Sequence, residues 1–451
     1  MVARFHNCPR DSPGRLPPDR IDSRLRCGSL PAMRYPKQVH EIAGIPVRDL
    51  ARDFGTPAYI YDAATIAAQI ARLRRFDVIR YAQKANSNLA VLDLMRRHGV
   101  LVDAVSAGEI QRALAAGYPA QGEPAPIVYT ADVFDREALD LVTLHGIPVN
   151  CGSPEMIDQY GERAPGGEIT LRINPGFGHG HSRKTNTGGE HSKHGIWHDE
   201  IVACVERATR ARLRVSGVHV HIGSGVDMEH LALVAEACCG FARRVGPSVT
   251  SISAGGGLPT PYRDEDVDVD VDAYFEIWDA ARHRLAQDLG HPVRLEIEPG
   301  RFLVAESGSL LTELRAVKRE GANLFYLLDA GFNALARPIL YGAYHPMAIA
   351  AADGSRSERP LVDVVVGGPL CESGDIFTQG EDGEVRSERL PEARVGDFLV
   401  IGCAGAYGFV MASNYNSKPR PAEVLIHGGK AHLVRARESL DDLLRGESIP
   451  S

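Results

Sequence analysis

The chain has 451 residues, of which 44% are hydrophobic and 24% are charged, and its formal net charge is -8. This length and composition are typical of a globular protein with a sizeable core and more than one domain. The acidic balance, without a basic block, argues against nucleic acid as the main partner. No apolar run approaches the roughly 20 residues that span a bilayer, and the first residues lack the apolar core of a secretory signal.

The eight cysteines are scattered without a Cys-x-x-Cys pair. In a chain of this length, such cysteines are typical of reduced thiols in a cytoplasmic protein. Residues 1–32 are rich in proline and arginine and contain few residues to bury, so we predict a disordered extension, with Met33 as an alternative start. Residues 33–57 are expected to pack with the C-terminal domain, and a short strand is expected at 58–61.

Between residues 58 and 301, strand-like and helical patterns alternate. Strands are predicted at 78–83, 100–105, 126–130, 147–151, 168–174, 215–222, 249–254 and 293–298. Helices are predicted at 88–98, 107–116, 135–144, 199–211, 228–245 and 272–289. Eight βα units in succession predict an α/β fold, a (β/α)8 TIM barrel with its reactive groups at the carboxyl ends of the strands. A doubly wound open sheet is the competing architecture, but a count of eight favours closure.

After residue 302 the pattern changes to short strands separated by turn residues. They are predicted at 309–318, 324–329, 361–366, 397–401 and 423–426, with a last helix at 439–445. This pattern predicts a C-terminal all-β domain over residues 302–451. The acidic run 264–272 is interpreted as a solvated loop because it lacks the spacing of an EF-hand.

Lys84 follows the first predicted barrel strand, which places it at the carboxyl end of an interior strand. Most lysines are solvated surface charges. At a buried strand end, however, we expect the side chain to lie in a cleft. A lysine removed from water loses its charge more readily, and its neutral amine can form a Schiff base with an aldehyde.

Polar and glycine residues follow other strands as well. Gly255–Gly257 forms either a simple tight turn or a cradle of backbone N–H groups for a phosphate. Ser224 and Arg301, at neighbouring strand ends, could add a hydroxyl and a charge to the same phosphate. Glu298 either forms a salt bridge with Arg301 or keeps a heterocyclic nitrogen protonated, which makes a pyridine ring an electron sink.

His219 and His221 alternate along one strand, so both are expected to project to the same side. A metal-binding pair is an alternative interpretation. Further ligands would then come from His179, His181, His191, His194 and His198. No carboxylate is spaced to complete the ligand set, so we predict no metal and favour a His221 imidazole stacked on a cofactor ring.

A lysine, a phosphate cradle, a pyridine-facing carboxylate and a stacking imidazole together predict a site for pyridoxal 5'-phosphate. From about residue 40 to about 440 the chain also resembles the diaminopimelate decarboxylase family. The resemblance rests on YAQKANSN, SAGEIQRALAAGY, TADVFD, LRINPGFGHGHSRKTNTGGEHSKHGIW, HVHIGSGVD, AGGG, LEIEPGRFLV, DAGFNALARP, GPLCESGD and GAYG followed by SNYNS. It implies an alanine-racemase-like barrel that decarboxylates meso-2,6-diaminopimelate to L-lysine.

The resemblance also implies roles for single residues. Lys84 would bind the cofactor covalently, His221 would stack on its ring and Glu298 would face its nitrogen. Phosphate contacts would come from Ser224, Gly255, Gly256, Gly257 and Tyr407, and Arg301 is a further cofactor contact. Substrate contacts would come from Arg301, Arg337, Tyr341, Glu372 and Tyr407.

In such enzymes a Cys-Glu pair comes from the partner subunit, so the resemblance implies a homodimer with shared sites. Cys371 would take part in protonation, with Lys84 as the alternative proton donor. A buried cysteine is usually inert packing. Cys371, however, lies on a loop with polar neighbours, which favours a reactive thiolate. The sequence departs from the family at Cys403-Ala404, where related sequences often have Asp-Thr.

Other functions remain open at this stage. A related decarboxylase could act on ornithine, arginine or carboxynorspermidine, although GHGHSRKTNTGGEHSKHG and GPLCESGD favour diaminopimelate. A non-catalytic binder of pyridoxal phosphate would need neither Cys371 nor the substrate arginines. A metal-dependent barrel hydrolase would be distinguished by metal analysis.

Overall fold

The computed structural model describes residues 34–178, 188–221, 223 and 228–450. The chain divides into a unit Met1–Arg34 and a compact unit Tyr35–Ser451, and only the second is described below. The predicted disordered extension, the Met33 start, Ser224, His179 and His181 lie outside the described residues. None of the described helices is both long and apolar enough to cross a membrane.

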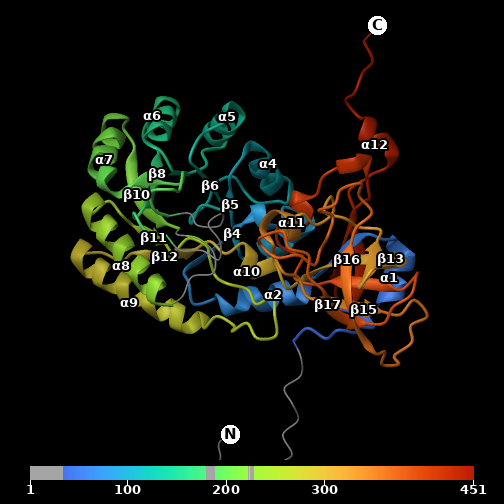
Figure 1. Ribbon diagram of the computed structural model, residues 1–451. Coiled ribbons are helices and arrows are strands. Elements are labelled where there is room, and N and C mark those ends of the chain that lie inside the picture. The colour runs from blue at the N-terminus through green and yellow to red at the C-terminus, as the bar shows by residue number, and fades with distance from the viewer. Residues whose placement is uncertain (1–33, 179–187, 222, 224–227, 451) are drawn as a thin grey trace, which may run out of the picture. The chain divides into compact units, whose positions relative to one another are not determined.

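Eight parallel strands form the closed barrel that the sequence predicts (Figure 1). They are β4 (Val78–Ala82), β5 (Leu101–Ala104), β6 (Ile127–Ala131), β7 (Val149–Cys151), β8 (Glu168–Asn174), β10 (Arg214–Val220), β11 (Ser251–Ser253) and β12 (Arg294–Ile297). The pairing of β12 with β4 closes the barrel. A two-residue strand, β9 (Ile196–Trp197), pairs in parallel with the end of β8.

Helices follow the barrel strands around the outside of the barrel (Figure 1). They are α3 (Leu89–Arg97), α4 (Ala107–Ala115), α5 (Arg136–His145), α6 (Pro154–Arg163), α7 (Ile201–Arg210), α8 (Met228–Val245), α9 (Val271–Leu289) and α10 (Arg301–Val304), with α2 (Ala63–Arg72) before β4. Several begin at side-chain caps, such as Asn88 before α3 and Asp270 before α9. Such caps satisfy N–H groups that the first turn of a helix leaves open. The sequence analysis did not predict α2 or α6.

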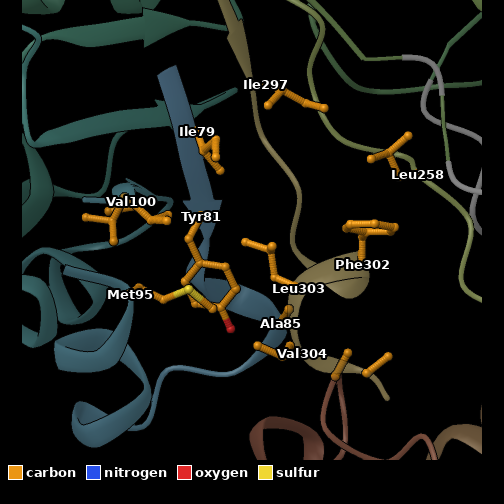
Figure 2. Close-up of a cluster of buried hydrophobic side chains, with 14 of the residues drawn as sticks. Ile79, Tyr81, Ala85, Met95, Val100, Leu258, Ile297, Phe302, Leu303 and Val304 are labelled. Carbon is orange, nitrogen blue, oxygen red and sulfur yellow. The ribbon is translucent and has the colours of Figure 1, made fainter. Parts of the chain in front are cut away.

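The strand that leads to Lys84 is held by apolar packing. Every residue of β4 is buried. Figure 2 shows Tyr81 of β4 beside Met95, and Leu303 and Val304 of α10 near Ala85, the residue after the lysine. This packing holds the end of β4 and the turn that follows it.

The second part of the unit is a sheet built around the long strand β13 (Gly308–Glu320). Its other strands are β3 (Ala58–Asp62), β14 (Asn323–Leu328), β15 (Met347–Ala350), β16 (Leu361–Gly367), β17 (Glu388–Pro391), β18 (Phe398–Ile401), β19 (Ala422–His427) and β20 (Lys430–Arg435). The five strands predicted after residue 302 are present, whereas β15, β17 and β20 were not predicted. A short helix, α11 (Arg337–Tyr341), lies between β14 and β15, and α12 (Leu440–Leu444) follows β20, where the last helix was predicted.

Strand β3 differs from the expected domain division, which placed residues 58–301 in the barrel. It pairs with β13 and β19, so the second sheet contains one strand from the N-terminal part of the chain. Before it lie the hairpin β1 (Glu41–Ile42) and β2 (Ile45–Pro46), and helix α1 (Val47–Phe54), whose Val47 and Leu50 pack in a buried cluster with Ile60. The domain boundaries themselves stay a prediction.

Candidate active site

A cavity of about 1160 Å³ lies at the carboxyl ends of the barrel strands and is also lined by residues that follow β13. Nine predicted site residues line it: Lys84, His221, Gly256, Gly257, Glu298, Arg301, Arg337, Tyr341 and Tyr407. The cavity therefore brings together residues more than 300 positions apart in the chain. Gly255, Cys371 and Glu372 do not line it, and Ser224 is not among the described residues.

Lys84 lies in a single 3-10 turn, Gln83–Ala85, directly after β4. The turn is held from the C-terminal part of the chain, because the Tyr407 backbone N–H donates to the Ala85 carbonyl at 2.8 Å. The Asn86 side chain likewise donates to the Gly405 carbonyl at 3.2 Å. The predicted position in a cleft is confirmed, but the expected removal of the lysine from water is wrong, because its side chain is exposed within the cavity wall.

Glu298 follows β12 and is buried, and both of its carboxylate oxygens accept hydrogen bonds. Oε2 lies 2.8 Å from His219 Nε2, and Oε1 accepts from the Ser253 hydroxyl at 2.8 Å. Burial alone raises the pKa of Glu298, but the charge and hydrogen bond of His219, with Ser253 and Arg80, outweigh it and hold the pKa at about 2. Glu298 is thus an ionised carboxylate. The salt bridge to Arg301 that the sequence left open is replaced by the contact with His219.

Asp103 is a cavity residue to which the sequence analysis assigned no role. It lies in β5 and is 3% exposed. Its Oδ1 has no hydrogen-bond partner among the described residues. Burial, followed by the nearby charge of Glu298, raises the pKa of Asp103 to about 8, so it holds a proton at neutral pH. Its place at a strand end was visible in the sequence, but the charge of its neighbour was not.

His219 and His221 both reach the cavity, as their alternation along β10 predicts. Burial, with the nearby charges of Arg172 and Lys84, holds the pKa of His221 well below its ordinary value, so its imidazole is neutral. Among the described residues, no group of three or more His, Cys, Asp or Glu side chains is arranged to hold a metal. His194, one of the further metal ligands considered from the sequence, contacts a carboxylate instead: in the loop after β8, its Nδ1 lies 2.5 Å from Asp132 Oδ2.

The glycine triplet is required by close backbone packing. Gly255 has φ of 62° and Gly257 has φ of 109°, values that side chains rarely adopt. A Cβ atom at Gly257 would collide with the Gly223 carbonyl oxygen, and one at Gly255 with the Val220 carbonyl oxygen. The ends of β10 and β11 can approach this closely only with glycine, which leaves Gly256 and Gly257 in the cavity wall.

Arg301 and Arg337 begin the short helices α10 and α11 and converge on a residue that the sequence analysis missed. Both donate from Nη1 to the phenol oxygen of Tyr262, at 2.9 and 3.2 Å respectively. Arg337 Nη1 also lies 2.8 Å from His345 Nε2. Neither Tyr262 nor His345 belongs to a motif that indicates chemistry, so only the fold brings them to the arginines.

Cys371 and Glu372 are exposed on a loop outside the cavity, where the Cys371 backbone N–H donates to Asn416 Oδ1 at 2.8 Å. Cys403, the departure from the family pattern, is 2% exposed with φ of 50°. Its thiol donates to the Tyr35 hydroxyl at 3.3 Å.

Comparison with known proteins agrees with this geometry. Residues 64–305 match the family model described as "Pyridoxal-dependent decarboxylase, pyridoxal binding domain". The chain is 56% identical over 400 residues to a diaminopimelate decarboxylase of Streptomyces coelicolor, covering 89% of this chain and 91% of the relative. It is 54% identical over 401 residues to that of Escherichia coli, covering 89% of this chain and 96% of the relative.

Solved structures extend the comparison. A crystal structure of a diaminopimelate decarboxylase, 53% identical, covers 88% of this chain and 95% of its own with a TM-score of 0.86. A Helicobacter pylori diaminopimelate decarboxylase complexed with L-lysine, 30% identical, covers 88% of this chain and 98% of its own with a TM-score of 0.79. The chain belongs to the pyridoxal-dependent decarboxylases and, within them, to the diaminopimelate decarboxylase family. It is accordingly a lyase that catalyses decarboxylation.

Proposed function

We propose that this enzyme decarboxylates meso-2,6-diaminopimelate to L-lysine and carbon dioxide with pyridoxal 5'-phosphate as cofactor. The observation that carries the proposal is the content of one cavity, which combines the amine of Lys84, the ionised buried carboxylate of Glu298 and two arginines. Among the described residues, neither arginine has a carboxylate partner. These groups match the needs of an amino-acid substrate with an anionic far end. The identity of more than half to two diaminopimelate decarboxylases supports the same substrate.

The residues present fit pyridoxal phosphate. Lys84 offers an exposed amine inside the cavity, and Glu298 offers a carboxylate that stays ionised. His221 is a neutral flat ring on the cavity wall, and Gly256 and Gly257 leave backbone accessible. When bound, the cofactor supplies a protonated pyridine ring that accepts the electron pair left by the departing carbon dioxide.

In the proposed site, Lys84 would hold the cofactor aldehyde and Glu298 would accept the ring N–H. His221 would lie against the ring. The phosphate would be bound by Ser224, Gly255, Gly256, Gly257, Arg301 and Tyr407. Because His219 and Ser253 both contact the Glu298 carboxylate, its position does not depend on the ligand.

Substrate contacts are proposed for Arg301, Arg337, Tyr341, Glu372 and Tyr407. A guanidinium is suited to a carboxylate through two parallel hydrogen bonds, and Glu372 is suited to an ammonium. Four of the five line the cavity, whereas Glu372 does not.

We also propose a homodimer in which each cavity is completed by the partner subunit's Cys371 and the partner subunit's Glu372. In support, both residues are exposed and lie outside the cavity of their own subunit. Cys371 would then donate the proton that replaces the lost carboxylate. The cytoplasm is the proposed compartment, since the six described cysteines form no disulfide.

The runner-up is a decarboxylase for ornithine, arginine or carboxynorspermidine. The purified enzyme should be supplied with pyridoxal phosphate and, separately, with meso-diaminopimelate, ornithine, arginine and carboxynorspermidine, and the products identified by mass spectrometry. Lysine from diaminopimelate alone is expected. A polyamine or polyamine precursor instead would keep the Lys84 chemistry but overturn the substrate assignment. Cofactor binding without any product would favour a binding protein.

A further inference from the structure

Four side chains form a connected cluster at the cavity: Arg301, Arg337 and Tyr262 line it, and His345 contacts Arg337 without lining the cavity itself. Tyr262 lies in the loop between β11 and α9, where its backbone N–H donates to Asp266 Oδ2 at 2.8 Å. His345 precedes β15 and is 1% exposed. The two rings pack edge to face, with centroids 5.6 Å apart and planes at 85°. Tyr262 thus joins a barrel loop to the C-terminal part of the cavity.

The hydrogen bonds of Tyr262 leave its own proton unused. Its oxygen accepts from Arg301 Nη1 at 2.9 Å and from Arg337 Nη1 at 3.2 Å. A phenol oxygen has two acceptor positions and one donor, so both acceptor positions are taken. Among the described residues, nothing accepts the remaining O–H. That proton is available to an acceptor on a bound ligand.

The His345 ring determines how Arg337 is presented. Nδ1 lies 3.0 Å from the Gly402 carbonyl, which can only accept, so Nδ1 carries the proton and Nε2 accepts from Arg337 Nη1. Burial, with the charge of Arg337, holds the pKa of His345 well below its ordinary value, in keeping with this neutral form. Both Nη1 hydrogens of Arg337 are therefore engaged, and its Nε–Nη2 edge is left for a ligand.

The cluster carries two positive charges without a counter-ion in the described part of the chain. No carboxylate there forms an ion pair with either Arg301 or Arg337, and Arg337 is 7% exposed. Burial lowers the pKa of Arg337, and the charge of Arg301 acts in the same direction. Two cations and one O–H donor that face the same cavity favour an anion with at least two oxygens, such as a carboxylate or a phosphate.

We propose that Tyr262 is a specificity-determining residue whose hydroxyl donates to the carboxylate at the far amino-acid centre of the substrate. Its oxygen at the same time keeps Arg301 and Arg337 in place, and His345 positions Arg337. This inference rests on the proposed function. It identifies the part of the site that distinguishes a substrate with a distal carboxylate from a diamine or a simple amino acid that lacks one.

The test compares two amines that differ by that carboxylate. L-lysine and 1,5-diaminopentane are titrated into the cofactor-loaded enzyme by isothermal calorimetry, for wild type, Tyr262→Phe and Tyr344→Phe. Tyr344 lines the same cavity, and its phenol lies 3.5 Å from Glu388 Oε1, so its variant is the matched loss of one hydroxyl. Phenylalanine at position 262 keeps the ring that packs on His345, which favours retained folding.

Tyr262→Phe is expected to weaken L-lysine binding about tenfold or more and to change diaminopentane binding by less than about twofold. Tyr344→Phe should leave the ratio of the two affinities unchanged. Because the ratio is taken within one protein, partial loss of folded material does not alter it. An unchanged ratio in Tyr262→Phe overturns the proposal.

Two parallel measurements separate the alternatives. If Tyr262→Phe weakens binding of pyridoxal phosphate but not of pyridoxal, and keeps the amine ratio, the cluster serves the cofactor phosphate and the proposal is wrong. Decarboxylation of meso-diaminopimelate by the wild type tests the proposed function alone. Lysine production together with an unchanged ratio would therefore reject Tyr262 and leave the function standing.

Discussion

Replacing Asp103 with asparagine should remove a specific pH dependence of stability. The ordinary pKa of this carboxyl is 3.8, and burial, with the charge of Glu298, raises it to about 8 in the folded protein. Above about pH 4 the unfolded chain has released this proton, whereas the folded protein keeps it until about pH 8. In this window the folded state binds one more proton than the unfolded state.

The sign and size follow from that proton. When the folded state binds one more proton, the free energy of unfolding falls by ~1.4 kcal/mol per pH unit. The contribution of Asp103 is fully present below about pH 4 and is lost as the pH rises through about 8. Between about pH 5.5 and about pH 7.5, Asp103→Asn should therefore gain ~2–3 kcal/mol of stability relative to the wild type.

Urea denaturation of the cofactor-free protein measures this change through tryptophan fluorescence, to which Trp278, fully buried in α9, contributes. The control is Asp140→Asn on α5, where the exposed carboxylate lies 3.1 Å from Arg163 Nη1. Its stability curve should run parallel to that of the wild type. Parallel curves for wild type and Asp103→Asn would show that Asp103 is ionised in the folded protein, and would refute the assignment of its proton.

Three further predictions test the site and its supports. Lys84→Ala should lose both turnover and the visible absorbance of lysine-bound pyridoxal phosphate; turnover that survives contradicts the role of Lys84. Lys84→Ala and Cys371→Ala subunits, each inactive alone, should recover about a quarter of wild-type activity when they are mixed in equal amounts and re-associated. Half of the dimers would then contain one subunit of each kind, and each such dimer has one complete shared site of two. No recovery argues against sharing. Arg80→Met should lower the free energy of unfolding by ~3 kcal/mol in urea denaturation, because the buried Glu296 carboxylate loses its ion pair with Arg80 Nη2 at 3.0 Å. A loss below ~1 kcal/mol would mean that Arg294 compensates.

The barrel could be predicted because each of its units carries a local signal. Helix α8 has the predicted bounds 228–245, and strand β8 has the predicted bounds 168–174. The elements that were missed carry weaker signals. Strand β15 is buried at all four positions and shows no alternation, and α6 contains Gly161, a residue that weakens a helical pattern.

The site residues likewise divide into those that a clear strand pattern predicts and those that it does not. Lys84 and Glu298 could be predicted because each lies at the end of a strand whose pattern is clear, and parallel strands place their carboxyl ends at one edge. Tyr262 and His345 could not, since they are brought together by loops 83 positions apart that have no periodicity. The exposure of Lys84 was also missed, because a strand end predicts a location and not its access to water.

Asp103 and Glu298 together explain how the cavity wall can hold two buried carboxyl groups. Two nearby buried carboxylates repel each other, so one of them keeps its proton, and the surrounding hydrogen bonds decide which. Glu298 receives a hydrogen bond from Ser253 and contacts His219, whereas Oδ1 of Asp103 has no partner in the described part of the chain. The negative charge is thereby assigned to Glu298. His219, which lines the cavity, and Ser253, which does not, thus determine which of the two buried carboxyl groups is ionised.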